Sequence, residues 1–167
     1  GVAALLVVLG GASSQTATDD TPTPSSVPGS SSPADADGQR CLVRLHGKGG
    51  LGEPTRFPED GSWMIFPEGN ADGWGSRQWL YATDDEFESA VQIVGDAIAD
   101  CDLVIVNGFS NGAAFAAKLY CSGETFDGRL LRVVIDDPVP DGGVVDCAPD
   151  PTVGVALYWT GALAATA

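Results

Sequence analysis

Residues 105–112 read Ile-Val-Asn-Gly-Phe-Ser-Asn-Gly and follow two further apolar residues. Such a run of aliphatic and β-branched residues predicts a central strand of a parallel sheet. Gly108 and Gly112 flank Ser110, and glycine lets a strand and a helix approach without a Cβ clash. The alanine-rich run 113–119 predicts that helix. We therefore expect Ser110 on a strained turn with its hydroxyl in open space; the alternative is a tight turn whose serine has no chemical role.

A second glycine-rich segment, residues 46–50, reads His-Gly-Lys-Gly-Gly and comes directly after the apolar run 41–45. The apolar run predicts a strand, and the glycines after it let neighbouring backbone N–H groups point together towards an anion. A serine that attacks an ester needs such donors, because negative charge develops on the carbonyl oxygen. The candidate donors are the amide of Asn111, just after the serine, and the amide of Gly47 or Lys48.

These two segments give the chain a resemblance to a known family. His46-Gly47-Lys48-Gly49-Gly50 is similar to the oxyanion loop of the alpha/beta-hydrolase superfamily, specifically of its secreted serine esterases. Gly108-Phe109-Ser110-Asn111-Gly112 is similar to the nucleophile elbow of that family. The resemblance covers about residues 41–161. It implies an α/β fold, a three-layer sandwich with a mainly parallel sheet, whose C-terminal part is missing.

The resemblance also implies roles for individual residues. Ser110 would be the nucleophile of an acyl-enzyme mechanism on carboxylic esters, with an oxyanion hole formed by Asn111, Gly47 and Lys48. Lys48 departs from the all-glycine loop of the family and leaves open which amide donates. The residues that would shape the two loops are His46, Gly49, Gly50, Gly108 and Gly112. The implied partner is a small-molecule or polymeric ester, and no cofactor is implied.

His46 is the only histidine in the chain. In the family that the chain resembles, the histidine of this loop orders the loop, and the general base comes later, after the last strand. We therefore expect His46 to shape the loop and the catalytic histidine to be missing. Since the chain begins inside an apolar run and stops just after an apparent strand at 153–159, we expect a fragment; the alternative is a degenerate enzyme that never had a base.

Two further pairs of residues are candidates for the site. Asp136 and Asp137 end an apolar, strand-forming run, which is one of the places where the family carries its catalytic acid. Trp74 and Trp79 lie in a loop expected beside the serine. They either form the wall of a substrate pocket or cover the top of the core, and the sequence does not separate these alternatives.

The rest of the chain alternates between expected strands and helices, as in a parallel sheet with helical crossovers. Further strands are expected at 63–66, 130–135 and 153–159. Residues 51–60 are the weak point of this interpretation. A crossover is needed there, but Pro54 and Pro58 disfavour a helix.

The clearest helix signal lies between residues 83 and 98. Thr83 and Glu86 have the spacing of a capping box, in which each residue's side chain bonds the other's backbone N–H. Apolar residues then repeat at helical spacing and are expected in the core: Phe87, Val91, Val94 and Ile98. After the alanine-rich helix, Gly123 is the expected helix stop.

Composition and charge narrow the class of protein. The 167 residues carry 23 acidic and 8 basic side chains, a net charge of −15, which argues against binding to nucleic acid and disfavours binding to anionic membranes.

Residues 1–12 resemble part of a signal peptide, and residues 13–39, rich in Ser, Thr, Pro and Asp, predict a disordered linker. Residues 40–167 would form an incomplete hydrolase-like domain. We expect a secreted protein without stable membrane insertion and leave its oligomeric state open.

Four cysteines in an exported chain predict disulfides, and their number leaves three pairings possible. The resemblance places Cys41 and Cys101 at one edge of two neighbouring parallel strands, and Cys121 and Cys147 also at the edge away from the site. It therefore implies the pairs 41–101 and 121–147. Since the chain has no C-x-x-C spacing and a single histidine, we expect no metal site.

Two other functions remain open at this stage. An acyltransferase would use the same serine chemistry and differ only in the acceptor of the acyl group. A non-catalytic binding module would keep the fold without a base. The sequence does not separate them from an ester hydrolase.

Overall fold

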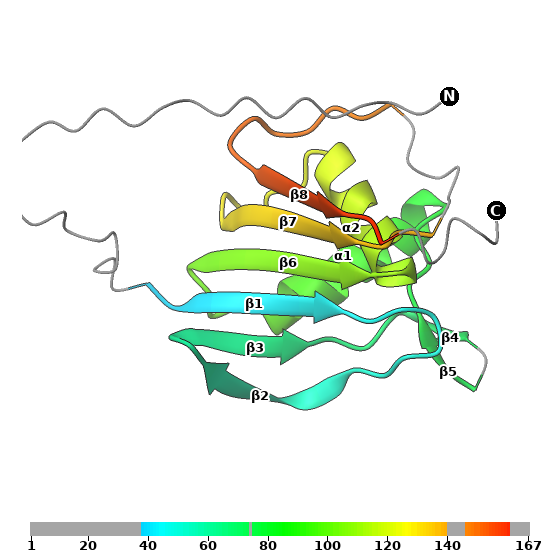
Figure 1. The fold of residues 1–167 in the computed structure, drawn as a ribbon, viewed down its shortest axis with the longest axis horizontal. Coiled ribbons are helices and arrows are strands. Elements are labelled where there is room, and N and C mark those ends of the chain that lie inside the picture. The colour runs from blue at the N-terminus through cyan, green and yellow to red at the C-terminus, as the bar shows by residue number, and fades with distance from the viewer. Residues whose placement is uncertain (1–37, 74, 140–145, 161–167) are drawn as a thin grey trace, which may run out of the picture. The chain divides into compact units, whose positions relative to one another are not determined.

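The computed structural model describes residues 38–73, 75–139 and 146–160, and this part of the chain contains a six-stranded sheet. The sheet order is β2-β3-β1-β6-β7-β8. The strands are β1 Arg40–Leu45, β2 Glu53–Glu59, β3 Ser62–Phe66, β6 Leu103–Phe109, β7 Leu130–Asp136 and β8 Gly154–Tyr158. Neighbours run parallel throughout, except that β2 is antiparallel to β3, as the arrows in Figure 1 show. The predicted α/β fold with a mainly parallel sheet is confirmed.

Three predictions fall on parts of the chain outside these residues. They are the signal-peptide segment 1–12, nearly all of the linker 13–39, and the position of Trp74.

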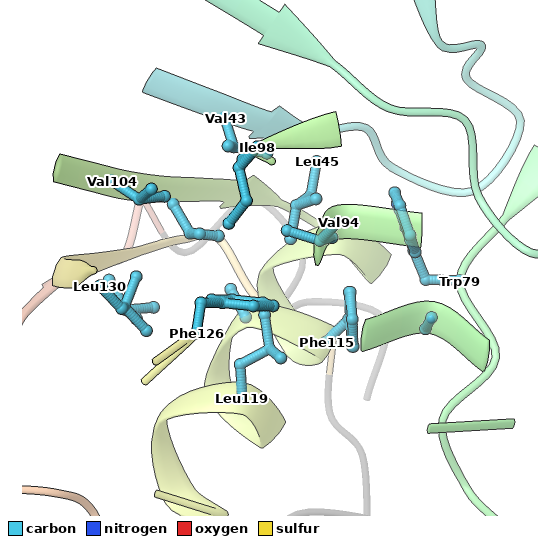
Figure 2. Packing of buried hydrophobic residues seen from close by; sticks show 14 of the residues in the cluster. Val43, Leu45, Trp79, Val94, Ile98, Val104, Phe115, Leu119, Phe126 and Leu130 are labelled. Carbon is cyan, nitrogen blue, oxygen red and sulfur yellow. The ribbon is translucent and has the colours of Figure 1, made fainter. Parts of the chain in front are cut away.

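Two helices, α1 Asp84–Ala97 and α2 Asn111–Cys121, pack against one face of the sheet. Alternate strand residues point to this face, and Val43, Val104 and Val133 are fully buried there. The helix side meets them with a set of equally buried side chains, several of which are labelled in Figure 2: Val94, Ile98, Phe115 and Leu119. Burying one such side chain contributes about 1.5–3 kcal/mol, so this layer is the main source of stability.

The ends of both helices agree with the sequence prediction. At the start of α1, the Thr83 side chain accepts from the Glu86 N–H while the Glu86 carboxylate accepts from the Thr83 N–H, which is the predicted capping box. After α2, Gly123 has φ 74°, a backbone conformation suited to glycine beyond a helix end. No helix in the described ranges is long and apolar enough to cross a lipid bilayer.

The segment at 51–60, where a crossover was needed, is a strand. β2 lies at the edge of the sheet, and its residues are exposed along their whole length. An edge strand tolerates Pro54 and Pro58 because its outer N–H groups need no partner, whereas a helix does not. A short hairpin follows β3, formed by β4 Ala71–Gly73 and β5 Ser76–Gln78.

Two disulfides join the four cysteines in the pairs that the resemblance implied. Cys41 is bonded to Cys101, with 5.9 Å between the Cα atoms, and ties the start of β1 to the residues before β6. Cys121 is bonded to Cys147, with 4.2 Å between the Cα atoms, and ties the end of α2 to the segment before β8.

Candidate active site

Ser110 lies at the turn between β6 and α2, at the carboxyl end of a central strand (Figure 1). Its backbone has φ 54° and ψ −114°, a conformation that costs a non-glycine residue about 1–3 kcal/mol. Space for the turn exists because two neighbours lack a side chain. A Cβ on Gly108 would lie 2.2 Å from the Gly112 carbonyl oxygen, and one on Gly112 would lie 2.4 Å from the Leu45 carbonyl oxygen.

The backbone of Ser110 is held on both sides of this turn. Its N–H donates to the Asp136 carbonyl oxygen at 3.1 Å, and its own carbonyl oxygen accepts from the Ala114 N–H at 3.1 Å. The Ser110 side chain makes no capping hydrogen bond to α2. The contacts that enforce the strained turn are therefore made by the backbone, and the hydroxyl is not used for them.

The glycine-rich loop lies against this serine. A Cβ on Gly47 would lie 3.2 Å from the Ser110 Cβ. The Gly50 N–H donates to the Gly47 carbonyl oxygen at 2.9 Å, and Gly49 between them has φ 86°, as in a tight turn that requires glycine at its third residue. The loop therefore brings its first glycine, rather than its last two, to the serine.

A neighbouring strand occupies the far side of the loop. The Gly49 N–H donates to the Arg77 carbonyl oxygen at 3.0 Å, and the Arg77 N–H donates to the Gly50 carbonyl oxygen at 3.0 Å. The backbone amides of both Gly49 and Gly50 are therefore engaged in hydrogen bonds within the fold.

His46 is bound within the loop through both ring nitrogens. Nε2 accepts from the Gly69 N–H at 3.0 Å, so we assign the proton to Nδ1, which lies 2.8 Å from the Gly47 carbonyl oxygen. Gly50 passes close beneath the ring, since a Cβ there would lie 2.9 Å from Nδ1. The ring of His46 is therefore in contact with backbone groups of both Gly47 and Gly69.

Asn111 begins α2, so its backbone N–H has no acceptor within the helix. Its side chain makes a contact that the sequence did not predict. Oδ1 accepts from the Trp79 N–H at 2.8 Å, and Nδ2 donates to the Trp79 carbonyl oxygen at 3.1 Å. Asn70 binds the N–H and carbonyl oxygen of Leu80 in the same way, at 2.8 and 2.9 Å. Asn111 and Trp79 are 32 residues apart in the sequence, so no local sequence pattern indicates this contact.

Trp79 is packed into the core and also lines a cavity, so the two roles considered for it remain predictions. Its side chain is only 1% exposed and stacks on Phe115 with 5.0 Å between ring centroids. A solvent-open cavity of about 270 Å³ lies beside it. The cavity is lined by Lys48, Gln78, Trp79, Leu80, Tyr81, Ala82, Asn111 and Val139. It adjoins both the glycine-rich loop 46–50 and the start of α2.

The two candidate acids differ in their surroundings. Asp137 is 7% exposed, and its carboxylate accepts from both the backbone N–H and the hydroxyl of Thr160, the N–H at 2.6 Å from Oδ1. Asp136 is half-buried at the end of β7. Among the described residues, no hydrogen bond joins either carboxylate to Ser110 or His46.

The two carboxyls with a clear pKa shift belong to other parts of the fold. A hydrogen bond from Arg56 lowers the pKa of Asp100, and one from Thr152 lowers the pKa of Asp150. Neither group belongs to the set of residues around Ser110. In the described ranges, no group of three or more His, Cys, Asp or Glu side chains is placed to hold a metal ion.

Comparisons with known proteins find solved structures with a similar backbone fold. No family model matches this chain, and no curated protein does. Similar solved structures include a protein of unknown function from Agrobacterium tumefaciens, 23% identical with a TM-score of 0.49, over 72% of this chain and 65% of that one. This chain thus spans slightly less than two thirds of that protein's length.

Two others are esterases. A carboxylesterase from Bacillus cereus is 18% identical with a TM-score of 0.49, over 72% of this chain and 78% of that one. An esterase from Pyrococcus furiosus is 19% identical with a TM-score of 0.37, over 61% of this chain and 43% of that one. The structures similar to this chain therefore include esterases, at low sequence identity.

Proposed function

We propose that this chain carries the nucleophile of a secreted serine hydrolase, which cleaves carboxylic esters through an acyl-enzyme on Ser110. The observation that carries the proposal is the turn at the end of β6. Ser110 has a strained backbone, a hydroxyl that makes no capping bond, and Gly47 lying against it. Backbone strain of this kind persists only where the surroundings enforce it, and it collects at functional sites.

In the proposed reaction, Ser110 Oγ attacks the carbonyl carbon of the ester, and the carbonyl oxygen becomes negatively charged. The amide of Asn111 and that of Gly47 or Lys48 donate hydrogen bonds to this oxygen, and each such donor contributes about 3–4 kcal/mol. When the intermediate collapses, the leaving oxygen takes the proton that the general base removed from Ser110, the alcohol departs, and the acyl group stays on Ser110. Water then attacks the acyl-enzyme and releases the acid.

We propose that the general base is a histidine outside residues 1–167. His46 is unsuited because both of its ring nitrogens are already bonded, to Gly47 and Gly69. Asp137 is the preferred acid, since its carboxylate is buried at the carboxyl end of β7 and a carboxylate has about four acceptor positions. Asp136 is the second candidate.

Export is part of the same proposal. The two disulfides favour an oxidising compartment, because such bonds are rare in cytosolic proteins. The apolar segment at residues 1–12 would then belong to a signal peptide.

An activated ester such as p-nitrophenyl acetate tests the proposal on the longest natural form of the protein. Ser110→Ala is expected to lower turnover by about 10³-fold or more, since removing a nucleophile abolishes the acyl-enzyme route. Ser122→Ala, at the opposite end of α2, is the matched control and leaves turnover unchanged. Turnover that survives Ser110→Ala contradicts the proposal, as does a natural form without turnover.

Two further assays test whether the acyl group passes to an alcohol and whether residues 1–167 are active alone. With an added alcohol, formation of a new ester would assign the same acyl-enzyme to acyl transfer. Residues 1–167 alone are expected to show negligible turnover, because their single histidine is bound in the loop.

A further inference from the structure

The segment 77–79 joins the two parts of the proposed site. At one end, the backbone of Arg77 exchanges two hydrogen bonds with Gly49 and Gly50, both at 3.0 Å. At the other end, the backbone of Trp79 exchanges two hydrogen bonds with the side chain of Asn111, at 2.8 and 3.1 Å. Three consecutive residues therefore connect the oxyanion loop to the first residue of α2.

This segment is held firmly, because Trp79 is locked into the core. Its indole is stacked on Phe115, one helical turn after Asn111, and its centroid lies 5.6 Å from that of the His46 ring. The side chain is almost completely buried. Because the Trp79 indole is stacked on Phe115, Trp79 cannot shift along α2 without displacing Phe115. The Asn111 side chain is therefore bonded to the backbone of a residue whose position is held by the core.

From these contacts we infer that the side chain of Asn111 is a positioning residue for the proposed reaction. It sets the separation between its own backbone amide and the amide of Gly47 or Lys48, through the segment 77–79. The inference rests on the proposed function. Two amides stabilise an oxyanion only when both lie about 2.7–3.1 Å from it, so a side chain that fixes their spacing changes the rate without touching the substrate.

Asn70 provides a matched control for this role. Its side chain makes the same two-point contact with the next residue, Leu80, at 2.8 and 2.9 Å, and also donates to the Glu86 carbonyl oxygen at 3.0 Å. It makes no hydrogen bond to the oxyanion loop or to α2 among the described residues. Asn70→Ala therefore removes a bond set of similar size from Leu80, the residue directly after the segment 77–79, but leaves the contact between Trp79 and Asn111 in place.

The test compares the two variants in the longest natural form. The rate at which a fluorophosphonate labels Ser110 is measured together with the melting temperature. Both variants are expected to melt at a lower temperature. Asn111→Ala is expected to label about 100-fold more slowly, because a displacement of about 1 Å costs that much, while Asn70→Ala labels at the wild-type rate. With an ester substrate, Asn111→Ala lowers kcat and leaves KM unchanged.

The labelling rates distinguish a failure of the positioning role from a failure of the proposed function. Equal labelling rates for Asn111→Ala and Asn70→Ala overturn the positioning role and leave the proposed function intact. A wild-type protein that is not labelled overturns the proposed function and this inference with it. If Asn111→Ala does not fold, Asn111→Gln takes its place. It keeps an amide but moves it by one methylene, so it is expected to label more slowly than Asn70→Ala, and a wild-type rate contradicts the inference.

Discussion

At the scale of single residues, a Cβ atom is excluded at the two glycines that flank Ser110 and has room at Gly95. An ideal Cβ built on Gly108 would lie 2.2 Å from a backbone carbonyl oxygen, and one built on Gly112 would lie 2.4 Å from another. Backbone atoms of a central strand and a buried helix have no room to move aside. Gly95, in contrast, lies in α1 with no atom within 4 Å of its ideal Cβ.

We predict opposite effects of alanine at these two kinds of position. Gly108→Ala is expected to lower the free energy of unfolding by about 3 kcal/mol, because overpacking forces the elbow apart. Gly95→Ala is expected to raise it by roughly 0.5–1 kcal/mol, because glycine in a helix costs backbone entropy. Urea unfolding followed by circular dichroism measures both. A Gly108→Ala variant as stable as the wild type would show that the turn is looser than its close contacts indicate.

At the scale of elements, the disulfides tie helices and strands together over different lengths of chain. Cys41 and Cys101 are separated by 60 residues and Cys121 and Cys147 by 26. Both cysteines of the first pair are buried in the core. By loop closure alone, the longer loop contributes about 4 kcal/mol and the shorter one about 3.5 kcal/mol.

The double variant Cys41→Ser/Cys101→Ser is therefore expected to be the less stable of the two double serine variants. Besides its larger loop, it places two hydroxyls in apolar surroundings, which adds an unsatisfied polar group to each site. Guanidinium unfolding without reductant gives the comparison. If Cys121→Ser/Cys147→Ser were the less stable variant, loop length and burial would not explain these bonds.

The elements with an apolar pattern were predictable, and those without one were not. β1, β6 and β7 were predicted from runs of apolar residues, and α1 was predicted from its capping box and helical spacing. β2 is exposed throughout and carries two prolines, so it has no apolar pattern to detect. The loop and the elbow were found from their glycines. The contact of Asn111 with Trp79 was not, because a hydrogen bond across 32 residues depends on the finished fold.

At the scale of the whole molecule, the net charge and the apolar strand at one end of the described sheet have opposite effects on association between copies of the chain. Among the described residues, β8 is the last strand of the sheet order. Val155, Leu157 and Tyr158 of this strand, together with Trp159 directly after it, are 46–63% exposed. Residues 152–160 contain no charged side chain, although charges are the usual protection of an edge strand. The net charge of −15 opposes association between copies of the chain.

We therefore predict that residues 1–167 associate more strongly as salt is added. The Debye length falls from about 30 Å at 0.01 M salt to about 8 Å at 0.15 M, which removes the repulsion and leaves the apolar edge. Light scattering at fixed protein concentration measures the effect. Leu157→Thr, which removes apolar area without changing charge or strand propensity, is expected to reduce it. Association that is unaffected by Leu157→Thr would place the associating surface elsewhere.

The most direct measurement is the site of covalent labelling in the longest natural form. The protein is treated with a fluorophosphonate, digested and analysed by mass spectrometry. The proposed function predicts one adduct per molecule, on the peptide that contains Ser110, and no adduct in Ser110→Ala. A natural form that stays unlabelled, or an adduct on another serine that persists in Ser110→Ala, would contradict the assignment of Ser110 as the nucleophile.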